Sequence, residues 1–231
     1  MSKTSPIVVF LHGAGTGAWI WERVGKNLSS RSLALDLPLS SDGLGPNGCA
    51  QLVWEEVGKQ GEAPIILVLH SWAGILAGNL YERFCARIQR TVFLSAIVDP
   101  TGGSFVDALP IPNRWITRQL MRRNPEGIRP SDKMIRREYC NDLGEKEAQE
   151  VVARFERQRP EPFLTPSTSF EPSGKETYIL CARDKSVPPA LQRKYAKRLG
   201  SPALITIDGG HLAMLSRPLE VAKAIEGSTS G

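Results

Sequence analysis

The chain has 231 residues, of which 41% are hydrophobic and 23% charged, and its formal net charge is +5. This composition is typical of a folded globular protein, which excludes disordered, collagen-like and coiled-coil chains. No run approaches the roughly 18 apolar residues that a membrane span needs, and Met1–Pro6 lacks the apolar stretch of a secretory signal. We therefore expect one domain with no membrane association.

Six short apolar runs predict the strands of a parallel sheet that is buried on both faces. They are Ile7–Leu11, Ser32–Leu37, Ile65–Leu69, Thr91–Ala96, Thr177–Ala182 and Ala203–Ile207. Helices are expected at Trp19–Ser29, Cys49–Lys59, Trp72–Arg87, Pro189–Leu199 and Leu212–Ile225. Strand and helix alternate along the chain, which favours an α/β fold built on a doubly wound, mostly parallel six-stranded sheet.

The alternation stops between the fourth and fifth strands. This stretch holds nine of the 17 prolines and helical patterns near Arg114–Arg123, Ser131–Tyr139 and Glu145–Gln158. It is too long for a structureless loop. We predict a small, mainly helical cap insertion over residues 100–175, called the cap segment below. Residues 1–99 and 176–226 would form the core, and 227–231 a flexible tail.

The excess of positive charge lies in the cap segment. Residues 113–137 contain eight basic and two acidic side chains. Interleaved aromatic residues and a known binding module are missing, so nucleic acid is not an expected partner. Two interpretations stay open: a solvated helix face, or a site that favours anionic substrates or surfaces.

The four cysteines are Cys49, Cys85, Cys140 and Cys181. None forms a CxxC pair, and none has metal-ligand spacing with a histidine. We expect free thiols in a reducing, cytoplasmic compartment, and no metal or cofactor.

Polar residues at the carboxyl ends of the strands are the candidates for chemistry, because ligands of open α/β sheets bind there. Ser71 follows the third strand and precedes a helix, as in a nucleophile elbow. The usual pattern is Gly-x-Ser-x-Gly, whereas this chain has Leu69 and Ala73 at the two glycine positions. The alternative is a serine that caps the helix.

Asp184 follows the fifth strand and His211 the sixth. Separately, the first could be an exposed turn residue and the second a capping or surface histidine. Together with Ser71 they have the order Ser, Asp, His that α/β-hydrolases use. Three strand-end positions in this order are far more specific than any one of them.

The first strand ends at His12, Gly13 and Ala14. Backbone N–H groups of this loop could face an oxyanion, although a simple turn would need its glycines as well. Trp19, Trp72, Phe105 and Trp115 either line a substrate pocket or pack in the core.

Four segments carry a resemblance to a known family: Phe10–Trp21, Leu69–Gly74, Ala182–Pro189 and Gly209–Ala222. They resemble the α/β-hydrolase superfamily and, within it, the plant methyl esterases, hydroxynitrile lyases and their bacterial esterase relatives. The ending formed by His211, Met214, Ser216 and Pro218 is similar to that group. The cap segment matches loosely, in Cys140–Asp142 before a helix.

The resemblance implies Ser71 as nucleophile, His211 as general base and Asp184 as the residue that orients it. It further implies an oxyanion hole from the backbone N–H groups of Ala14 and Trp72. Substrate contacts are expected from residues near these groups, namely His12, Gly13, Trp19, Phe105 and Trp115. The expected activity is hydrolysis of a small carboxylic ester through an acyl-enzyme, with no cofactor.

Three alternatives remain. The lyase branch often has Thr after the first-strand His and Lys after the catalytic His, whereas this chain has Gly13 and Leu212. A non-catalytic member that binds a small ligand is the second, because Leu69 could distort the elbow. Hydrolysis of an amide or a carbon–carbon bond is the third, since the same triad serves all of these reactions. The sequence leaves the oligomeric state open.

Overall fold

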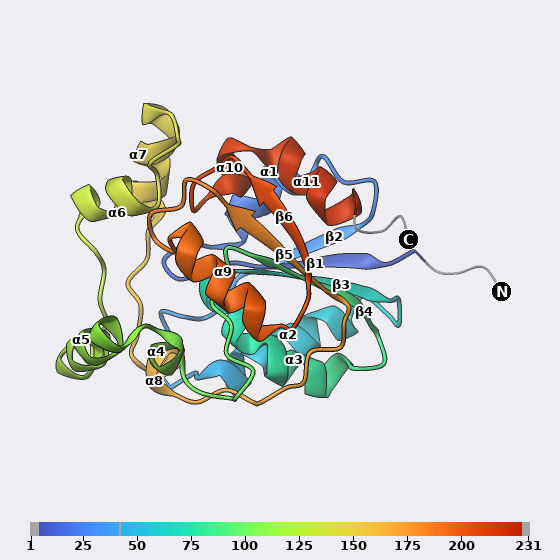
Figure 1. The fold of residues 1–231 in the computed structure, drawn as a ribbon, viewed down its shortest axis with the longest axis horizontal. Coiled ribbons are helices and arrows are strands. Elements are labelled where there is room, and N and C mark those ends of the chain that lie inside the picture. The colour runs from blue at the N-terminus through green and yellow to red at the C-terminus, as the bar shows by residue number, and fades with distance from the viewer. Residues whose placement is uncertain (1–4, 42, 228–231) are drawn as a thin grey trace.

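The computed structural model describes residues 5–41 and 43–227. Its strands form one sheet in the order β2-β1-β3-β4-β5-β6, and every neighbouring pair is parallel. The strands are β1 (Ile7–Leu11), β2 (Ser32–Leu35), β3 (Ile65–His70), β4 (Ile88–Leu94), β5 (Glu176–Cys181) and β6 (Ala203–Ile207). The predicted α/β fold is confirmed, and the described sheet is parallel throughout rather than mostly so (Figure 1).

Strand β1 and residues 65–69 of β3 are apolar at every position because both faces of these strands are covered. The other inner strands, β4 and β5, also have polar residues near their amino ends. In β1, Val9 and Leu11 point into one core layer, whereas Val8 and Phe10 point into the other. Successive side chains of a strand alternate between its faces, so a continuous apolar run fits only a doubly covered sheet. Each fully buried aliphatic side chain contributes roughly 1.5–3 kcal/mol.

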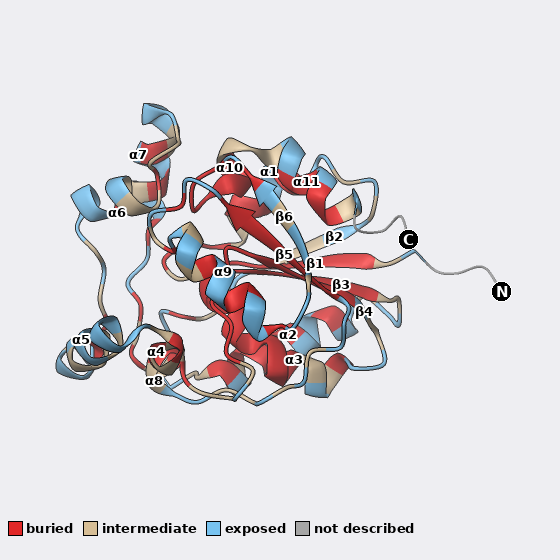
Figure 2. Cartoon of the chain, viewed as in Figure 1, coloured by how far each residue is buried: buried red, intermediate tan, exposed pale blue. Residues whose placement is uncertain are grey.

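Two groups of helices cover the sheet (Figures 1 and 2). On one face lie α2 (Pro46–Gly58), α3 (Ala77–Phe84) and α9 (Pro189–Arg198). On the other lie the 3-10 helix η1 (Ala18–Trp21), α1 (Glu22–Gly25), α10 (Ala213–Ser216) and α11 (Pro218–Gly227).

Three predicted helices are each divided in two, and their prediction as single helices is wrong. The stretch after β1 becomes η1 and α1, and the stretch after β3 becomes the 3-10 helix η2 (Ser71–Leu76) and α3. The helix predicted at Leu212–Ile225 becomes α10 and α11, which are separated at Arg217. Pro218 disfavours helical backbone at the residue before it, which accounts for that interruption.

Between β4 and β5 the described chain contains five helices and no strand. They are α4 (Phe105–Ala108), α5 (Ile111–Arg123), α6 (Asp132–Glu138), α7 (Glu145–Arg154) and α8 (Glu161–Leu164). In Figure 1, α5, α6 and α7 lie at the end of the sheet opposite the chain termini, where the strands reach their carboxyl ends. The boundaries of the cap segment stay a prediction.

Gly227 is the last residue of α11, and the rest of the predicted tail, 228–231, lies outside the described residues. Among the residues that the structure describes, no helix combines the length and apolar character needed to cross a membrane.

Helix α3 packs closely against the backbone at Thr168, and a substitution at Gly78 tests this contact. A Cβ there would lie 2.0 Å from the carbonyl oxygen of Thr168, whereas a Cβ at Gly58 would meet nothing within 4 Å. We expect Gly78→Ala to lower the unfolding free energy by roughly 1–3 kcal/mol through overpacking. Gly58→Ala, the matched control, should leave it unchanged or raise it by up to about 1 kcal/mol. Urea denaturation measures both, and equal stability of the two variants would contradict the close packing.

Candidate active site

Ser71 lies at a sharp turn between β3 and η2, with a left-handed backbone φ of 53°. The helix-cap position is His70, and no side chain caps η2, so the interpretation of Ser71 as a cap is wrong. Gly13 lies against the turn: a Cβ there would be 2.6 Å from the Ser71 Cβ. A Cβ at Gly74 would be 2.3 Å from the carbonyl oxygen of Ile97. Two glycines thus let neighbouring backbone approach the turn.

The two departures from the usual elbow pattern fit into the core. Leu69 and Ala73 are both fully buried in the layer that faces α2 and α3. The serine between them still has its left-handed backbone. A bulky residue two positions before the serine is therefore compatible with the turn.

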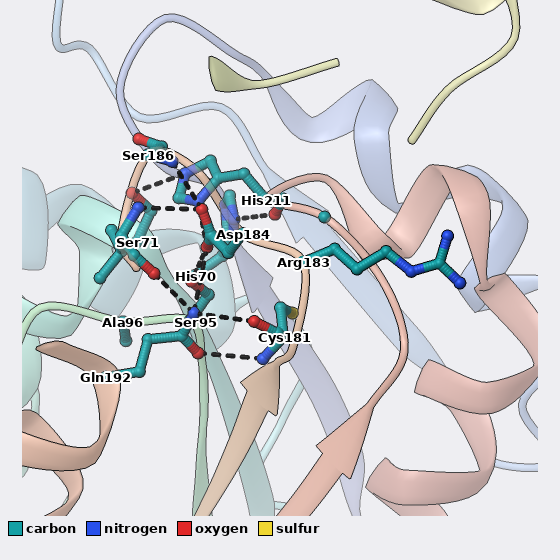
Figure 3. Close-up of polar contacts among 12 residues, drawn as sticks. His70, Ser71, Ser95, Ala96, Cys181, Arg183, Asp184, Ser186, Gln192 and His211 are labelled. Atoms are coloured by element: carbon teal, nitrogen blue, oxygen red, sulfur yellow. Dashed lines mark hydrogen bonds and ion pairs between the residues drawn. The ribbon is translucent and has the colours of Figure 1, made fainter. Parts of the chain in front are cut away.

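The side chains of Ser71, His211 and Asp184 form a continuous chain of contacts (Figure 3). His211 Nε2 lies 3.1 Å from Ser71 Oγ, and His211 Nδ1 lies 2.8 Å from Asp184 Oδ2. Their relative exposures are 8% for the serine, 1% for the histidine and 3% for the aspartate. Asp184 is therefore not an exposed turn residue, and His211 is not a surface histidine.

Four donors besides His211 bind the Asp184 carboxylate. Its Oδ1 accepts the backbone N–H groups of Ser186, at 2.8 Å, and Val187, at 2.9 Å. Its Oδ2 accepts the Ser95 hydroxyl and, at 3.3 Å, the Gln192 amide. Since every partner donates, the group acts as an acceptor, which places the proton of the histidine on Nδ1 and leaves the Nε2 lone pair facing the serine.

Ser95 and Gln192 are residues that the sequence reasoning missed. Ser95 directly follows β4 and also has a left-handed backbone, with φ 44°. The search for polar residues at strand ends could have found it. Gln192 is fully buried on α9; its Oε1 accepts Cys181 N–H at 3.0 Å, and its Nε2 also donates to the Val187 carbonyl at 2.7 Å. No sequence pattern marks such a residue.

His12 holds the loop after β1. Its Nε2 accepts the Leu37 backbone N–H at 2.8 Å, so Nδ1 carries the proton and donates to the Gly13 carbonyl at 2.8 Å. Thr16 Oγ1 donates to the same carbonyl at 3.1 Å. Burial lowers the pKa of His12. Both ring nitrogens of His12, which was predicted as a substrate contact, thus form hydrogen bonds with backbone groups.

Two backbone N–H groups beside the serine have no acceptor within the described part of the chain, those of Ala14 and Trp72. The Trp72 side chain is fully buried, and its Nε1 donates to the Pro162 carbonyl at 3.1 Å. The nucleophile turn is thereby joined to α8 of the cap segment.

His70 supports the ring of His211. Its Nε2 donates to the His211 carbonyl at 3.0 Å, and the two ring centroids lie 4.7 Å apart. Burial, with a smaller contribution from the charge of the neighbouring histidine, holds the pKa of His70 well below its ordinary value. His70 is therefore neutral at physiological pH.

Two aromatic residues of the cap segment, Tyr139 and Phe155, pack next to His211. The Tyr139 ring contacts His211 edge to face at 5.2 Å between centroids and Phe155 at 5.0 Å. Burial raises the pKa of the Tyr139 hydroxyl to about 12, and this hydroxyl hydrogen-bonds Ser186. Phe155 reaches the first loop as well, where a Cβ on Gly15 would lie 2.1 Å from its ring. The sequence reasoning missed both aromatic residues.

The predicted pocket aromatics lie in three different places. Phe105 packs against Phe163, and Phe163 packs against Trp72 beside the serine, at centroid distances of 5.0 and 6.1 Å. Trp19 lies under the Arg154 guanidinium, 4.2 Å away, at the edge of a surface cavity of about 500 Å³.

Trp115 is 67% exposed on α5, beside other exposed apolar residues of that helix, Ile111, Ile116 and Leu120 (Figure 2). Within the described residues no hydrogen bond, ion pair or ring contact connects Trp115 to Ser71, so the structure does not bring it together with the triad.

Most of the basic residues at 113–137 bind partners within the cap segment. Four ion pairs account for half of them: Arg118–Asp107, Arg129–Asp132, Arg136–Glu145 and Arg137–Glu138. Arg114 donates to the Asp107 carbonyl. These contacts favour the interpretation of the stretch as a solvated helix face.

The four cysteines are free, and three of them are buried. Across residues 5–41 and 43–227, no group of three or more His, Cys, Asp or Glu side chains is arranged to hold a metal ion.

A family model described as "Alpha/beta hydrolase family" matches residues 8–224. Among named relatives, polyneuridine aldehyde esterase of Rauvolfia serpentina is 23% identical, and the alignment covers 97% of this chain and 96% of the relative. Salicylic acid-binding protein 2 of Nicotiana tabacum is 24% identical, with 94% of each chain covered. Methylesterase 10 of Arabidopsis thaliana is also 24% identical, with 94% of this chain and 90% of the relative covered.

Solved structures share the fold. An extracellular α/β-hydrolase from a Paenibacillus species has a TM-score of 0.87 at 17% identity, with 96% of this chain and 98% of the other covered. Polyneuridine aldehyde esterase has a TM-score of 0.81 at 20% identity, with coverages of 98% and 100%.

The two buried histidines, His12 and His70, predict a pH dependence of stability. Their pKa values are lowered in the folded state, so below about pH 6.5 the unfolded chain binds protons that the folded chain does not. We expect the unfolding free energy to fall between pH 6.5 and 5, by up to about 1.4 kcal/mol per pH unit for each histidine.

Urea denaturation at several pH values measures this slope. His70→Gln keeps an N–H donor for the His211 carbonyl and should remove one of the two contributions, flattening the slope. A wild-type stability that is constant from pH 6.5 to 5 would contradict the neutral state of both rings.

Proposed function

Since the chain belongs to the alpha/beta hydrolase family, we propose that it is a carboxylesterase-type serine hydrolase that cleaves a small ester. The observation that carries the proposal is the chain of contacts from Ser71 Oγ through His211 to Asp184. The named relatives support it, because they include an aldehyde esterase and methylesterases.

In the proposed reaction, His211 Nε2 takes the proton from Ser71 Oγ as this oxygen attacks the ester carbonyl carbon. The tetrahedral intermediate then expels the alcohol, which receives that proton from the histidine. Water, deprotonated by the same nitrogen, attacks the acyl-enzyme, releases the acid and restores the serine. Asp184 keeps the histidine in the required tautomer and stabilises its charged form.

The proposed oxyanion hole consists of the backbone N–H groups of Ala14 and Trp72. Its support is that neither N–H has an acceptor among the described residues. Trp72 directly follows Ser71, and Ala14 follows Gly13, where a Cβ would lie 2.6 Å from the Ser71 Cβ. Each such donor contributes roughly 3 kcal/mol to transition-state stabilisation. His12 acts indirectly in this proposal, since it holds the Gly13 carbonyl and thereby the shape of the loop.

We propose an apolar substrate pocket beside Ser71 to which the rings of Trp72, Phe163 and Phe105 contribute. These three rings continue from the nucleophile turn into the cap segment, so they suit a small apolar acyl or alcohol group. Substrate contact by Trp19 and Trp115 stays a prediction, because the first lies under the Arg154 guanidinium and the second is exposed on α5.

Two positions favour the esterase over a hydroxynitrile lyase. A threonine at Gly13 would place its Cβ 2.6 Å from the Cβ of Ser71. The residue after His211 is the fully buried Leu212, which offers no positive charge to a leaving cyanide.

Ser71→Ala should lower kcat/KM for p-nitrophenyl esters by roughly 10⁴–10⁶-fold, since it removes the nucleophile. It should also abolish covalent labelling by a fluorophosphonate, which peptide mass spectrometry would locate at Ser71 in the wild type. Ser40→Ala, on the surface beside Glu156, is the matched control and should keep full activity. If the folded wild type is not labelled at Ser71, the ester hydrolase proposal fails and the ligand-binding alternative stands.

A panel of p-nitrophenyl esters of increasing acyl length, run beside a mandelonitrile cleavage assay, separates the esterase from the lyase. We expect turnover of short-chain esters far above the Ser71→Ala background and mandelonitrile cleavage at that background, because no cation assists cyanide departure. Serine-dependent mandelonitrile cleavage faster than ester hydrolysis would overturn the assignment.

A further inference from the structure

Two consecutive residues of the cap segment bind the loops that carry the acid and the base. The Asn141 side-chain amide donates to the carbonyl of Arg183, at 3.0 Å. The Asp142 carboxylate accepts the backbone N–H of Gly210, at 2.6 Å. Arg183 directly precedes Asp184, and Gly210 directly precedes His211. Each of the two residues is therefore one peptide unit from a member of the triad.

We propose that Asn141 and Asp142 are positioning residues. Their hydrogen bonds to the Asp184 and His211 loops, called the clamp below, keep His211 within proton-transfer distance of Ser71. This proposal rests on the serine hydrolase function proposed above. The clamp acts through backbone and touches no substrate.

The Asp142 carboxylate accepts two hydrogen bonds and lies in close contact with Gly210. Its Oδ2 also accepts the hydroxyl of Ser216, at 2.7 Å, so one oxygen binds both the residue before His211 and the last residue of α10. Any side chain at Gly210 would collide with the carboxylate, since a Cβ would lie 2.4 Å from Asp142 Oδ1. Glycine at this position thus serves the close approach of the cap segment.

Two further contacts join the loops directly. The Arg183 backbone N–H donates to the Gly209 carbonyl at 2.9 Å, and the Arg183 side chain pairs with Asp208. The side chains of that ion pair are 49% and 68% exposed, so solvent screens it. Positioning of the base is shared: Asn141 and Asp142 hold the two loops from the cap segment, Tyr139 lies against the ring of His211, and His70 binds its carbonyl.

The consequence concerns the 3.1 Å separation of His211 Nε2 and Ser71 Oγ. Proton transfer requires hydrogen-bond reach, and a displacement of about 1 Å at a reacting group lowers the rate by roughly a hundredfold. Loss of the clamp should therefore act on the chemical step rather than on substrate binding.

Asp142→Ala and Asn141→Ala test the clamp with a p-nitrophenyl ester as substrate. We expect kcat to fall roughly ten- to a hundredfold for Asp142→Ala and less for Asn141→Ala, with KM changed less than about threefold. Asp142→Asn keeps an oxygen acceptor for the Gly210 N–H and should recover most of kcat. Asp132→Ala, which removes a cap-segment carboxylate that pairs with Arg129, is the matched control and should behave as wild type.

A readout without substrate separates this proposal from the proposed function. The Nδ1–H proton shared by His211 and Asp184 should give a strongly deshielded proton NMR resonance in the wild type and in Asp132→Ala. Asp142→Ala should broaden or remove it while circular dichroism shows a folded protein. Should Asp142→Ala fail to fold, Ser216→Ala, which removes the second donor to the carboxylate, and Asp142→Asn carry the same comparison.

Wild-type kcat and an unchanged resonance in folded Asp142→Ala would overturn the clamp. So would an equal loss of kcat in Asp132→Ala. Absence of Ser71 labelling in a wild type that shows the resonance would instead overturn the hydrolase function and leave the clamp supported by the NMR comparison.

Discussion

The left-handed backbone of Ser71 is the constraint on which the rest of the site depends. A non-glycine residue held there costs on the order of 1–3 kcal/mol and persists only where its surroundings enforce it. Here they do: Gly13 and Gly74 let the first loop and the chain after β4 approach without side chains, and the Ile97 N–H donates to the Ser71 carbonyl at 3.0 Å. Within the described residues, Ser95 is the one other non-glycine residue with positive φ, and it binds Asp184.

The strained turn lies where the side chains of His211 and Asp184 reach Ser71. Parallel strands bring their carboxyl ends to one edge, so Ser71, Asp184 and His211 converge although up to 140 residues separate them. Buried donors saturate Asp184, and the cap segment holds the loops from outside through Asn141 and Asp142. The sheet thus brings Ser71, His211 and Asp184 to one edge, and the surrounding hydrogen bonds fix their positions relative to one another.

The sheet and the chain of contacts from Ser71 through His211 to Asp184 were accessible from the sequence because both follow from local pattern. Ile7–Leu11 and Ala203–Ile207 are strands with the predicted bounds. The first is buried at every position, as a continuous apolar run in a doubly covered strand predicts, whereas the second is an edge strand that is mostly exposed. Gln192, Tyr139 and Asp142 were not predicted, because their roles arise from contacts between segments that are distant along the chain. Trp115 was predicted near the substrate from its residue type, yet it is exposed, since aromatic character does not determine which face of a helix is buried.

The most direct measurement of the central claim, a strained serine served by the triad and two backbone donors, is a crystal structure of the protein after reaction with a fluorophosphonate. The account predicts phosphorus bonded to Ser71 Oγ and a phosphonyl oxygen within hydrogen-bond distance of the Ala14 and Trp72 N–H groups. Ser71 should keep its positive φ, and His211 should still contact Asp184. Phosphorus on another residue, or a phosphonyl oxygen directed away from both N–H groups, would contradict the account.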